Sequence, residues 1–291
     1  MRKKGCFCKK AIFFKAWMGV TACFPKSNLA IFALYMRLAS TVLKAIFTIY
    51  GFILFISFML VIFPFVIIAS FFGKLRGGNA IYMLCKAWAR FFLFFTGIRV
   101  IHIYEGLKPE PGKQYVCVFN HISYLDIPLL MLALPQNRFR VLGKAELTKV
   151  PLFGFLYRNA VVLVERSNSG ARAKSVMQLK SILRKGISVV IAPEGTFNIT
   201  HKPLKEFYDG AFKVAIETQT PVKPILFLDA YDRLPYKPIL SLNPGKARIV
   251  YLDEVPVDGY SLKDAPVLKD KVYKMMEEKL LAYKASWINN E

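Results

Sequence analysis

The sequence has few residues of the kinds that ligate metal ions. Its 291 residues include three histidines, at positions 102, 121 and 201, and five cysteines that form no Cys-x-x-Cys pair. This spacing matches no recognisable zinc or iron site, so we expect neither a metal ion nor another cofactor. An odd number of cysteines also argues against a closed disulfide framework, and we expect the thiols to be reduced.

Several motifs of common enzyme classes are also missing. The chain lacks the Gly-x-Ser-x-Gly elbow of many serine hydrolases, the Gly-x-Gly-x-x-Gly turn of dinucleotide-binding domains and the phosphate loop ending in Gly-Lys-Ser/Thr. A serine hydrolase that acts on membrane lipids would need an exposed nucleophile, so this class is disfavoured. Kinase and dinucleotide-dependent functions have no support.

Acidic residues are scarce relative to basic ones. The chain has 19 aspartates and glutamates against 41 lysines and arginines, a formal net charge of +22. Such a charge suits nucleic acid, anionic lipid or an acidic carrier or substrate. The densest basic group, "MRKKGCFCKK", precedes an apolar segment, which favours an anionic membrane surface as partner. We expect no nucleic-acid partner.

One apolar run is long enough to enter a bilayer. Residues 45–73 contain no charged side chain, and about 20 such residues suffice for a helix to cross the hydrocarbon core. The run also contains Pro64, so it fits either one tilted, kinked helix or a re-entrant hairpin. Basic residues flank both ends, which mildly favours the hairpin, and the sequence leaves both open.

The next stretch, "GGNAIYMLCKAWARFFLFFTG" at residues 77–97, mixes two cations with aromatic residues. This composition is typical of a helix that lies in a membrane interface, and a helix packed on the main domain is about equally compatible with it. We therefore expect residues 1–97 to form a basic, membrane-anchoring helical region.

From residue 98 onward, short β-rich runs alternate with helical periods. This pattern predicts an α/β domain over 98–291, with a mixed, mostly parallel sheet flanked by helices. The expected strands cover residues 98–104, 115–120, 160–165, 187–192, 224–228 and 247–253. The expected helices cover residues 124–133, 170–185, 207–218 and 266–284.

Polar residues stand at three of the expected strand ends. In open α/β sheets, ligands bind beyond the carboxyl ends of the strands, so these residues are the first candidates for a site. One strand runs into Asn120-His121, a second into Glu165-Arg166, and a third into Pro193-Glu194-Gly195-Thr196.

The first of these strand ends, "NHISYLD", allows two interpretations. Ser123 and Asp126 have the spacing of a capping box at a helix start, which gives Asp126 a structural role. One continuous helix would place His121 and Asp126 about 140° apart around its axis, so a contact between them requires a strand-turn-helix. In such a turn Asp126 can accept the Nδ1 proton of His121 and leave Nε2 as a general base. The two interpretations are compatible.

The ordered set of motifs resembles a known family. "NHISYLD" resembles the histidine-x4-aspartate block of the glycerolipid acyltransferases typified by lysophosphatidic acid acyltransferase. "GKAELTKVPLFGFLYRNAVVLVER", "APEGT" and "TPVKPI" resemble that family's second, third and fourth blocks, in the same order. The blocks lie between about residues 98 and 230, and residues 1–40 have no counterpart among them.

The resemblance implies a function and a role for each matched residue. His121 would act as general base on the acceptor hydroxyl, with Asp126 orienting it, and the alkoxide would attack an acyl thioester. Arg166 would hold the acceptor's phosphate by charge-assisted hydrogen bonds, and Glu194, Gly195 and Thr196 would shape that pocket. Two further residues of the first block, Asn120 and Tyr124, are supporting candidates or packing residues.

The implied reaction is the acylation of 1-acylglycerol-3-phosphate to phosphatidic acid at a membrane. The donor would be an acyl-carrier protein or coenzyme A thioester. The net charge of +22 slightly favours the acyl-carrier protein, because that protein is strongly acidic. The expected location is the cytoplasmic (inner) membrane, with the catalytic domain on its cytoplasmic face.

The sequence departs from the family in its third block. Phe197 follows Glu-Gly-Thr where the family commonly has arginine or serine, which weakens the expected headgroup contact. The acceptor could therefore be a lyso-aminolipid of the ornithine or glycine lipid type. A non-catalytic lipid-binding membrane protein is the other alternative.

Overall fold

The structure is a computed structural model that describes residues 26–164 and 169–289. Its contacts divide the chain into two units, Met1–Leu43 and Lys44–Glu291. Residues 26–43 of the first unit belong to helix α2 (Lys26–Ser70), and the rest of α2 is part of the second unit. The basic segment expected at a lipid surface, residues 1–10, lies outside the described residues.

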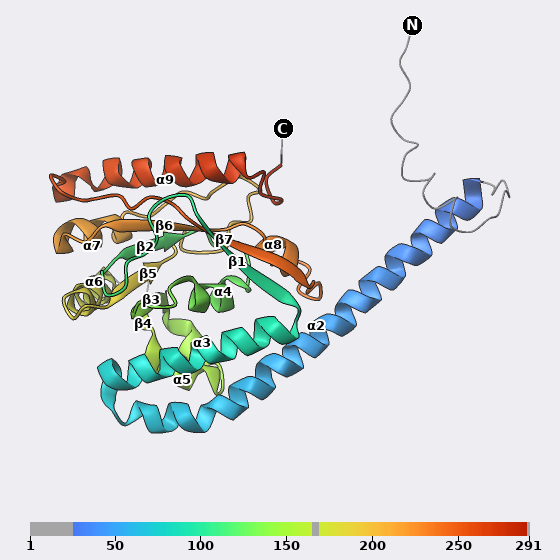
Figure 1. Ribbon diagram of the computed structural model, residues 1–291, viewed down its shortest axis with the longest axis horizontal. Helices are drawn as coiled ribbons and strands as arrows, with labels where there is room; N and C mark the ends of the chain where they lie inside the picture. Colours follow the sequence, from blue (N-terminus) through green and yellow to red (C-terminus); the bar gives the residue numbers. More distant parts are fainter. Residues whose placement is uncertain (1–25, 165–168, 290–291) are drawn as a thin grey trace, which may run out of the picture. The chain divides into compact units, whose positions relative to one another are not determined.

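A seven-stranded sheet forms the centre of the second unit (Figure 1). The strand order is β1-β7-β6-β2-β5-β3-β4, and neighbouring strands are parallel except for the antiparallel pair β6 and β7. The expected mixed, mostly parallel α/β sheet is therefore confirmed. The strands are β1 (Ile98–Tyr104), β2 (Val116–Phe119), β3 (Phe139–Lys144), β4 (Val162–Val164), β5 (Ser188–Ile191), β6 (Val222–Phe227) and β7 (Gly245–Tyr251).

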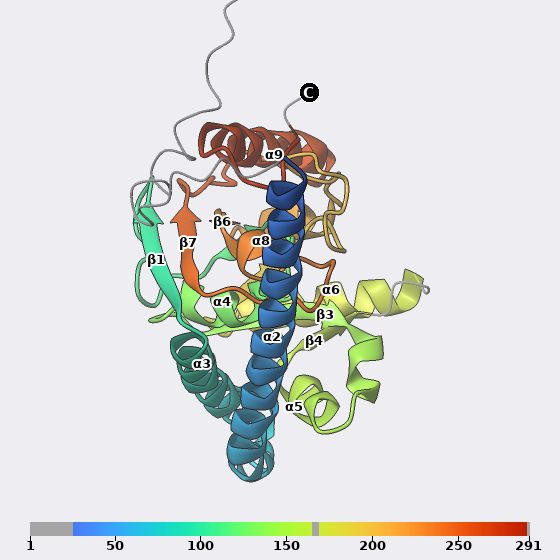
Figure 2. The ribbon, with the colours of Figure 1, turned by 90° about the vertical axis from the view of Figure 1, so that its right-hand side faces the viewer.

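Helices cover both faces of the sheet, with α7 and α9 on one face and α3, α4 and α5 on the other (Figures 1 and 2). The inner strands β2, β5 and β6 are buried along their whole length, as expected for parallel strands between helical layers. The helices that follow α2 are α3 (Gly78–Phe95), α4 (Asp126–Ala133), α5 (Phe153–Ala160), α6 (Ser169–Leu183), α7 (Gly210–Thr218), α8 (Ala230–Arg233) and α9 (Ala265–Ala282). Shorter helical turns are η1 (Gly73–Gly77), η2 (Ala145–Lys149) and η3 (Leu262–Asp264).

Residues 45–70 of the apolar run belong to one uninterrupted helix. α2 continues through Pro64 to Ser70, so the hairpin considered within residues 45–73 is wrong. Its segment Ile31–Ser70 is long and apolar enough to cross a membrane by length and composition. The chain reverses only afterwards, at η1, and aromatic pairs then join α2 to α3, such as Phe55 with Trp88 at a ring-centroid distance of 5.0 Å.

Helix α3 has one buried and one exposed apolar face. Ile81, Ala89 and Leu93 are buried against the domain, which confirms the alternative of a packed helix for this face. Met83 and Phe94 are 68% and 76% exposed, and the interfacial role expected for such residues stays a prediction. α3 shares a compact unit with the sheet, and the functional division expected at residues 97/98 also stays a prediction.

Strand β3 and helices α5 and α8 were not predicted from the sequence. β3 reads "FRVLGK" and α5 reads "FGFLYRNA", so each is short and interrupted by a glycine that weakens its periodic pattern. The structure explains both glycines by close packing. A Cβ added at Gly143 of β3 would overlap the Tyr157 hydroxyl of α5, and one at Gly154 would overlap the carbonyl group of Thr148.

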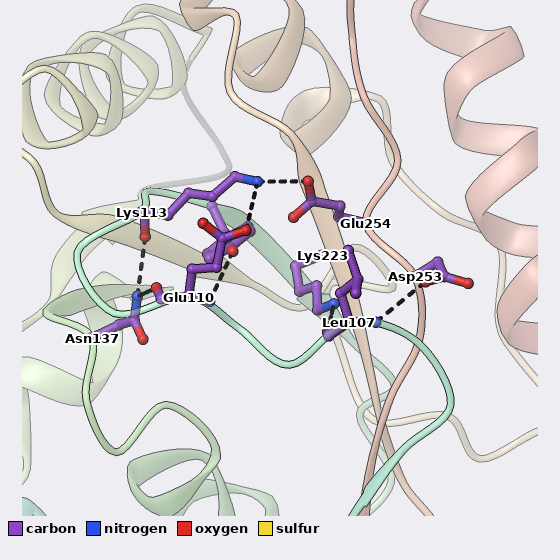
Figure 3. Close-up of polar contacts among 8 residues, drawn as sticks. Leu107, Glu110, Lys113, Asn137, Lys223, Asp253 and Glu254 are labelled. Carbon is purple, nitrogen blue, oxygen red and sulfur yellow. Dashed lines mark hydrogen bonds and ion pairs between the residues drawn. The ribbon is translucent and has the colours of Figure 1, made fainter.

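A buried polar group lies at the amino end of the central strands (Figure 3). Lys223 of β6 is fully buried, and its Nζ donates a hydrogen bond of 2.6 Å to the carbonyl oxygen of Leu107. Among the described residues, no carboxylate oxygen lies within 4.0 Å of this Nζ. Burial lowers the pKa of Lys223, and the carboxylates of Glu254 and Asp253 partly offset that effect.

Neighbouring contacts fix the connection between β1 and β2. Lys113 forms an ion pair of 2.7 Å with Glu254, and Asn137 Nδ2 donates to the carbonyl oxygens of Glu110 and Lys113 at 2.8 and 3.0 Å (Figure 3). We call Lys113, Asn137, Lys223 and Glu254 the amino-end cluster. Its hydrogen bonds to backbone carbonyls tie residues 107–113 to the sheet.

Candidate active site

Two of the three polar strand ends meet at the carboxyl edge of the sheet. β2 and β5 are adjacent parallel strands, so the residues that follow them, His121 and Glu194, come to lie side by side. The third polar strand end, Glu165-Arg166 after β4, lies outside the described residues. The predicted phosphate contact of Arg166 therefore stays a prediction.

His121 and Asp126 form the contact that the spacing allowed. Nδ1 of His121 lies 2.8 Å from Oδ2 of Asp126, and the Asp126 side chain is 1% exposed against 23% for His121. The buried carboxylate fixes the proton on Nδ1 and therefore the tautomer of the ring. His121 Nε2 has no hydrogen-bond partner among the described residues, which leaves a basic nitrogen at a partly exposed position.

Asp126 also organises the turn between β2 and α4. Its Oδ2 accepts hydrogen bonds from the backbone N–H groups of Ile122 and Ser123, at 2.8 and 2.9 Å. The helix begins at Asp126 and has no side-chain cap, so the expected capping box with Ser123 at its N-cap is only half formed. Ser123 Oγ instead accepts from the Leu125 N–H and donates to the carbonyl oxygen of Leu234. One carboxylate thus shapes the turn and orients the histidine.

Glu194 supports the same histidine through its backbone. Its Oε1 accepts from the N–H of His121 and its Oε2 from the N–H of Lys205, each at 2.9 Å, and the side chain is fully buried. Burial raises the pKa of Glu194 to about 7, and the nearby Asp126 carboxylate contributes to the rise, while the two backbone hydrogen bonds oppose it. Substrate contact by Glu194 stays a prediction, because both oxygens are occupied by backbone groups.

The turn after β5 completes the support of His121. Gly195 has φ +74°, a conformation that favours glycine and that turns the chain back toward β2. Asn198 then donates its backbone N–H to the carbonyl oxygen of His121 at 2.7 Å. Thr196 Oγ1 accepts a hydrogen bond of 3.0 Å from Lys205 Nζ. The backbone of His121 is therefore held at both its N–H and its carbonyl group.

Aromatic side chains cover one side of the histidine. The Phe197 ring lies 4.3 Å from the His121 ring and 4.8 Å from the Tyr124 ring, measured between centroids. Tyr124, an expected supporting residue, thus contacts Phe197, which packs on the histidine, and is 46% exposed. An apolar ring occupies the position where the family commonly has a polar side chain.

Asn120, the other expected supporting residue, joins two strands. Its Nδ2 donates to the carbonyl oxygen of Phe227 and its Oδ1 accepts from the N–H of Phe227, at 3.1 and 2.8 Å. Because Asn120 is buried and both amide atoms are used, it fixes the end of β2 against β6. Its contribution to the site is the position of the following residue, His121.

The sequence reasoning missed two contributors to the site. Asn198 and Lys205 both contact the His121–Glu194 pair through backbone N–H groups, and Lys205 also places a cation beside Thr196. No motif marks either residue, because each acts through its main chain and the contacts depend on strand order. Among the residues that the structure describes, no group of three potential metal ligands occurs.

Comparison with known proteins agrees with this geometry. Residues 100–228 match the family model described as Acyltransferase. A crystal structure of the 1-acyl-sn-glycerophosphate (LPA) acyltransferase PlsC from Thermotoga maritima has the same fold, with a TM-score of 0.68 and 21% sequence identity. That likeness covers 86% of this chain and 100% of the other. Residues 100–228 are therefore similar to the acyltransferase family, as the resemblance of the four blocks predicted.

Within that family, the similar sequences include 1-acyl-sn-glycerol-3-phosphate acyltransferases. The human beta protein of that name is 26% identical over 195 residues, which are 67% of this chain and 69% of the relative. The human alpha protein is 32% identical over 182 residues, 62% of each chain. The chain thus spans about two thirds of the length of these relatives.

Proposed function

We propose that the protein is a membrane-bound acyltransferase that acylates 1-acylglycerol-3-phosphate to phosphatidic acid. The observation that carries the proposal is the His121–Asp126 pair, in which a buried carboxylate holds Nδ1 and Nε2 bonds to none of the described residues. The names of the sequence relatives support this substrate class, since both human proteins are 1-acyl-sn-glycerol-3-phosphate acyltransferases.

The arrangement suits transfer of an acyl group to an alcohol. His121 Nε2 removes the proton from the acceptor hydroxyl as its oxygen attacks the thioester carbonyl. A C–O bond forms, the C–S bond breaks, and the imidazolium returns its proton to the leaving thiolate. Asp126 stabilises the imidazolium during this step, because its carboxylate lies 2.8 Å from Nδ1.

The acceptor's phosphate requires cations near this pair. Arg166 is the family's candidate, and Lys205 offers a second one because its Nζ lies 3.0 Å from Thr196 Oγ1. Phe197, packed on His121, supports the alternative that the acceptor is a lyso-aminolipid of the ornithine or glycine lipid type. Parallel assays with 1-acylglycerol-3-phosphate and lyso-ornithine lipid distinguish the two acceptors.

The donor is a thioester of acyl-carrier protein or of coenzyme A. The net charge of +22 favours the strongly acidic carrier protein. Donor competition with the purified protein tests this preference, and turnover with coenzyme A thioesters alone would overturn it.

Membrane attachment is supported by the apolar surface of the described residues. Phe52, Val61 and Phe65 of α2 are each more than half exposed, as are Phe91 and Phe94 of α3. A bilayer covers such surface, and we place the catalytic domain on the cytoplasmic face of the inner membrane. The protein should therefore pellet with membranes and be released by detergent but not by salt.

The substitution His121→Ala tests the enzymatic function. We expect transfer of a labelled acyl group to lysophosphatidic acid to fall by about 10²–10⁴-fold, because the general base is lost. The matched control His102→Ala removes a histidine on β1 that bonds Tyr251 instead, and should stay within about two-fold of wild type. Full activity of the His121 variant would favour the non-catalytic lipid-binding alternative.

A further inference from the structure

A basic cavity lies away from the candidate active site. It has a volume of about 230 Å³ and lies between η1, α5, the start of β4 and the end of α6. Four cationic side chains line it, Lys74, Arg140, Arg158 and Lys185, and we call it the four-cation pocket. Among the described residues, no aspartate or glutamate contributes to its lining.

Arg140 is the buried member of this group. It is 4% exposed, and its guanidinium donates only to neutral oxygens, among them Asn79 Oδ1 at 2.8 Å and the carbonyl of Phe139 at 2.9 Å. No carboxylate of the described residues lies within 4.0 Å of it. Burial lowers the pKa of Arg140, and a buried cation without an anionic partner is costly. An anion in the adjacent cavity would supply that partner.

The other three cations are exposed and come from distant parts of the sequence. Lys74 belongs to η1, Arg158 to the end of α5, and Lys185 to the turn before β5. None of them forms an ion pair with a carboxylate in the part of the chain that the structure describes. Four like charges around one cavity repel each other, and a bound anion would convert that repulsion into attraction.

Neutral donors beside the cations suit an oxyanion. Asn159, Gln178 and Ser181 also line the cavity, and their amide and hydroxyl groups can donate hydrogen bonds to several oxygens. Arginine in particular suits phosphate, because its planar guanidinium matches two phosphate oxygens. A volume of about 230 Å³ is several times that of a water molecule at ~30 Å³, so a phosphate group with a small substituent fits.

The position of Lys74 indicates the source of the phosphate. It directly follows the apolar residues 45–73 and lies in η1, the turn after the helix that could enter a bilayer. A cation at this place lies where lipid headgroups begin, if the membrane attachment proposed above is correct. We propose that the four-cation pocket binds the phosphate group of an anionic phospholipid, separately from the acceptor in the active site.

Isothermal titration of the full-length protein in detergent tests the proposal. The probes are dihexanoyl phosphatidylglycerol, zwitterionic dihexanoyl phosphatidylcholine and inorganic phosphate. The test variant is Arg158→Gln/Lys185→Gln, whose two side chains are exposed and whose loss leaves buried Arg140 in place. The matched control is Lys271→Gln/Lys274→Gln, which removes two exposed charges from α9 on the opposite face of the sheet.

We expect the test variant to bind phosphatidylglycerol at least ten-fold more weakly than wild type, and the control variant to bind within two-fold. Phosphatidylcholine should bind more weakly than phosphatidylglycerol to the wild-type protein. Equal loss in both variants would mean general attraction to a basic surface and would overturn the pocket. Binding of inorganic phosphate as tight as that of phosphatidylglycerol would overturn the lipid as its source.

The same titration with His121→Ala separates this proposal from the proposed function. That variant lacks the catalytic base but keeps all four cations, so its affinity for phosphatidylglycerol should equal that of wild type. A catalytically active protein whose test variant binds phosphatidylglycerol normally would refute the pocket and leave the acyltransferase function intact.

Discussion

The two ends of the central strands carry buried polar groups that differ in one respect. At the carboxyl end, His121 is fixed through its Nδ1, its backbone N–H and its carbonyl group, and its Nε2 has no partner among the described residues. At the amino end, the side-chain nitrogens of Lys113, Asn137 and Lys223 donate to backbone carbonyls or to the Glu254 carboxylate (Figure 3). Burial and polarity therefore do not identify the site. A rigidly held group with one free reactive atom does.

This comparison predicts that substitutions at the carboxyl end change the rate and that those at the amino end do not. The largest effect is expected for Asp126→Asn. An amide is neutral and cannot serve as the carboxylate partner of an imidazolium, and its nitrogen would place a donor at the buried Oδ1 position, which has no hydrogen-bond partner among the described residues. We expect kcat to fall by about 10²–10⁴-fold.

The control for this variant is Asp270→Asn, which changes an exposed aspartate on α9 in the same way and should leave kcat within about two-fold of wild type. Circular dichroism and thermal unfolding of both variants show whether the fold is kept. A folded Asp126→Asn enzyme with nearly normal kcat would mean that the carboxylate shapes the turn only.

A smaller effect, on stability rather than rate, is expected at Glu194. Its pKa is raised from 4.5 to about 7, so the folded state holds a proton that the unfolded state releases between these values. The contribution of Glu194 to the free energy of unfolding is therefore complete below pH 4.5. It is lost as pH rises through about 7, and a pKa shift of this size corresponds to roughly 3 kcal/mol. Glu194→Gln does not titrate and should abolish this loss.

Denaturant unfolding between pH 4.5 and 7.5 measures this difference. The unfolding free energy of wild type minus that of Glu194→Gln should decrease as pH rises, and Glu206→Gln at a nearby exposed position provides the control. A difference that is independent of pH would show that Glu194 is already ionised throughout this range.

The two ends also differ in how far the sequence predicts them. The strand-turn-helix around His121 follows from local spacing, because the histidine and its aspartate are five residues apart. The role of Glu194 depends on β2 and β5 being neighbours, a non-local fact that strand propensity does not contain. For the same reason the backbone contacts of Asn198 and Lys205 could not be foreseen.

The fold shows the same limit. The six expected strands have long β-rich runs and were all found, whereas β3 and α5 depend on glycines whose purpose is visible only in the packing between them. Helix α2 exceeds the apolar run at its amino end, since helical residues 26–44 precede it and include polar side chains. Sequence periodicity thus predicts the helices and strands that have a long regular pattern, whereas the short elements interrupted by glycine depend on tertiary packing.

The smallest effect is expected for Lys223→Met in the amino-end cluster. Methionine keeps the apolar length of the side chain and removes a buried charge, and it gives up the hydrogen bond to the Leu107 carbonyl. These changes oppose each other, so we expect the unfolding free energy to change by less than about 2 kcal/mol and kcat to stay within two-fold.

The pH dependence reveals the charge that this substitution removes. The pKa of Lys223 is lowered from 10.5, so the unfolded state binds more protons than the folded state as pH approaches that value. Lys223 therefore raises the free energy of unfolding of the wild-type protein as pH rises, and this increase should be absent in Lys223→Met. If kcat also fell ten-fold in this variant, the two ends of the strands would be coupled and the amino-end cluster would belong to the site.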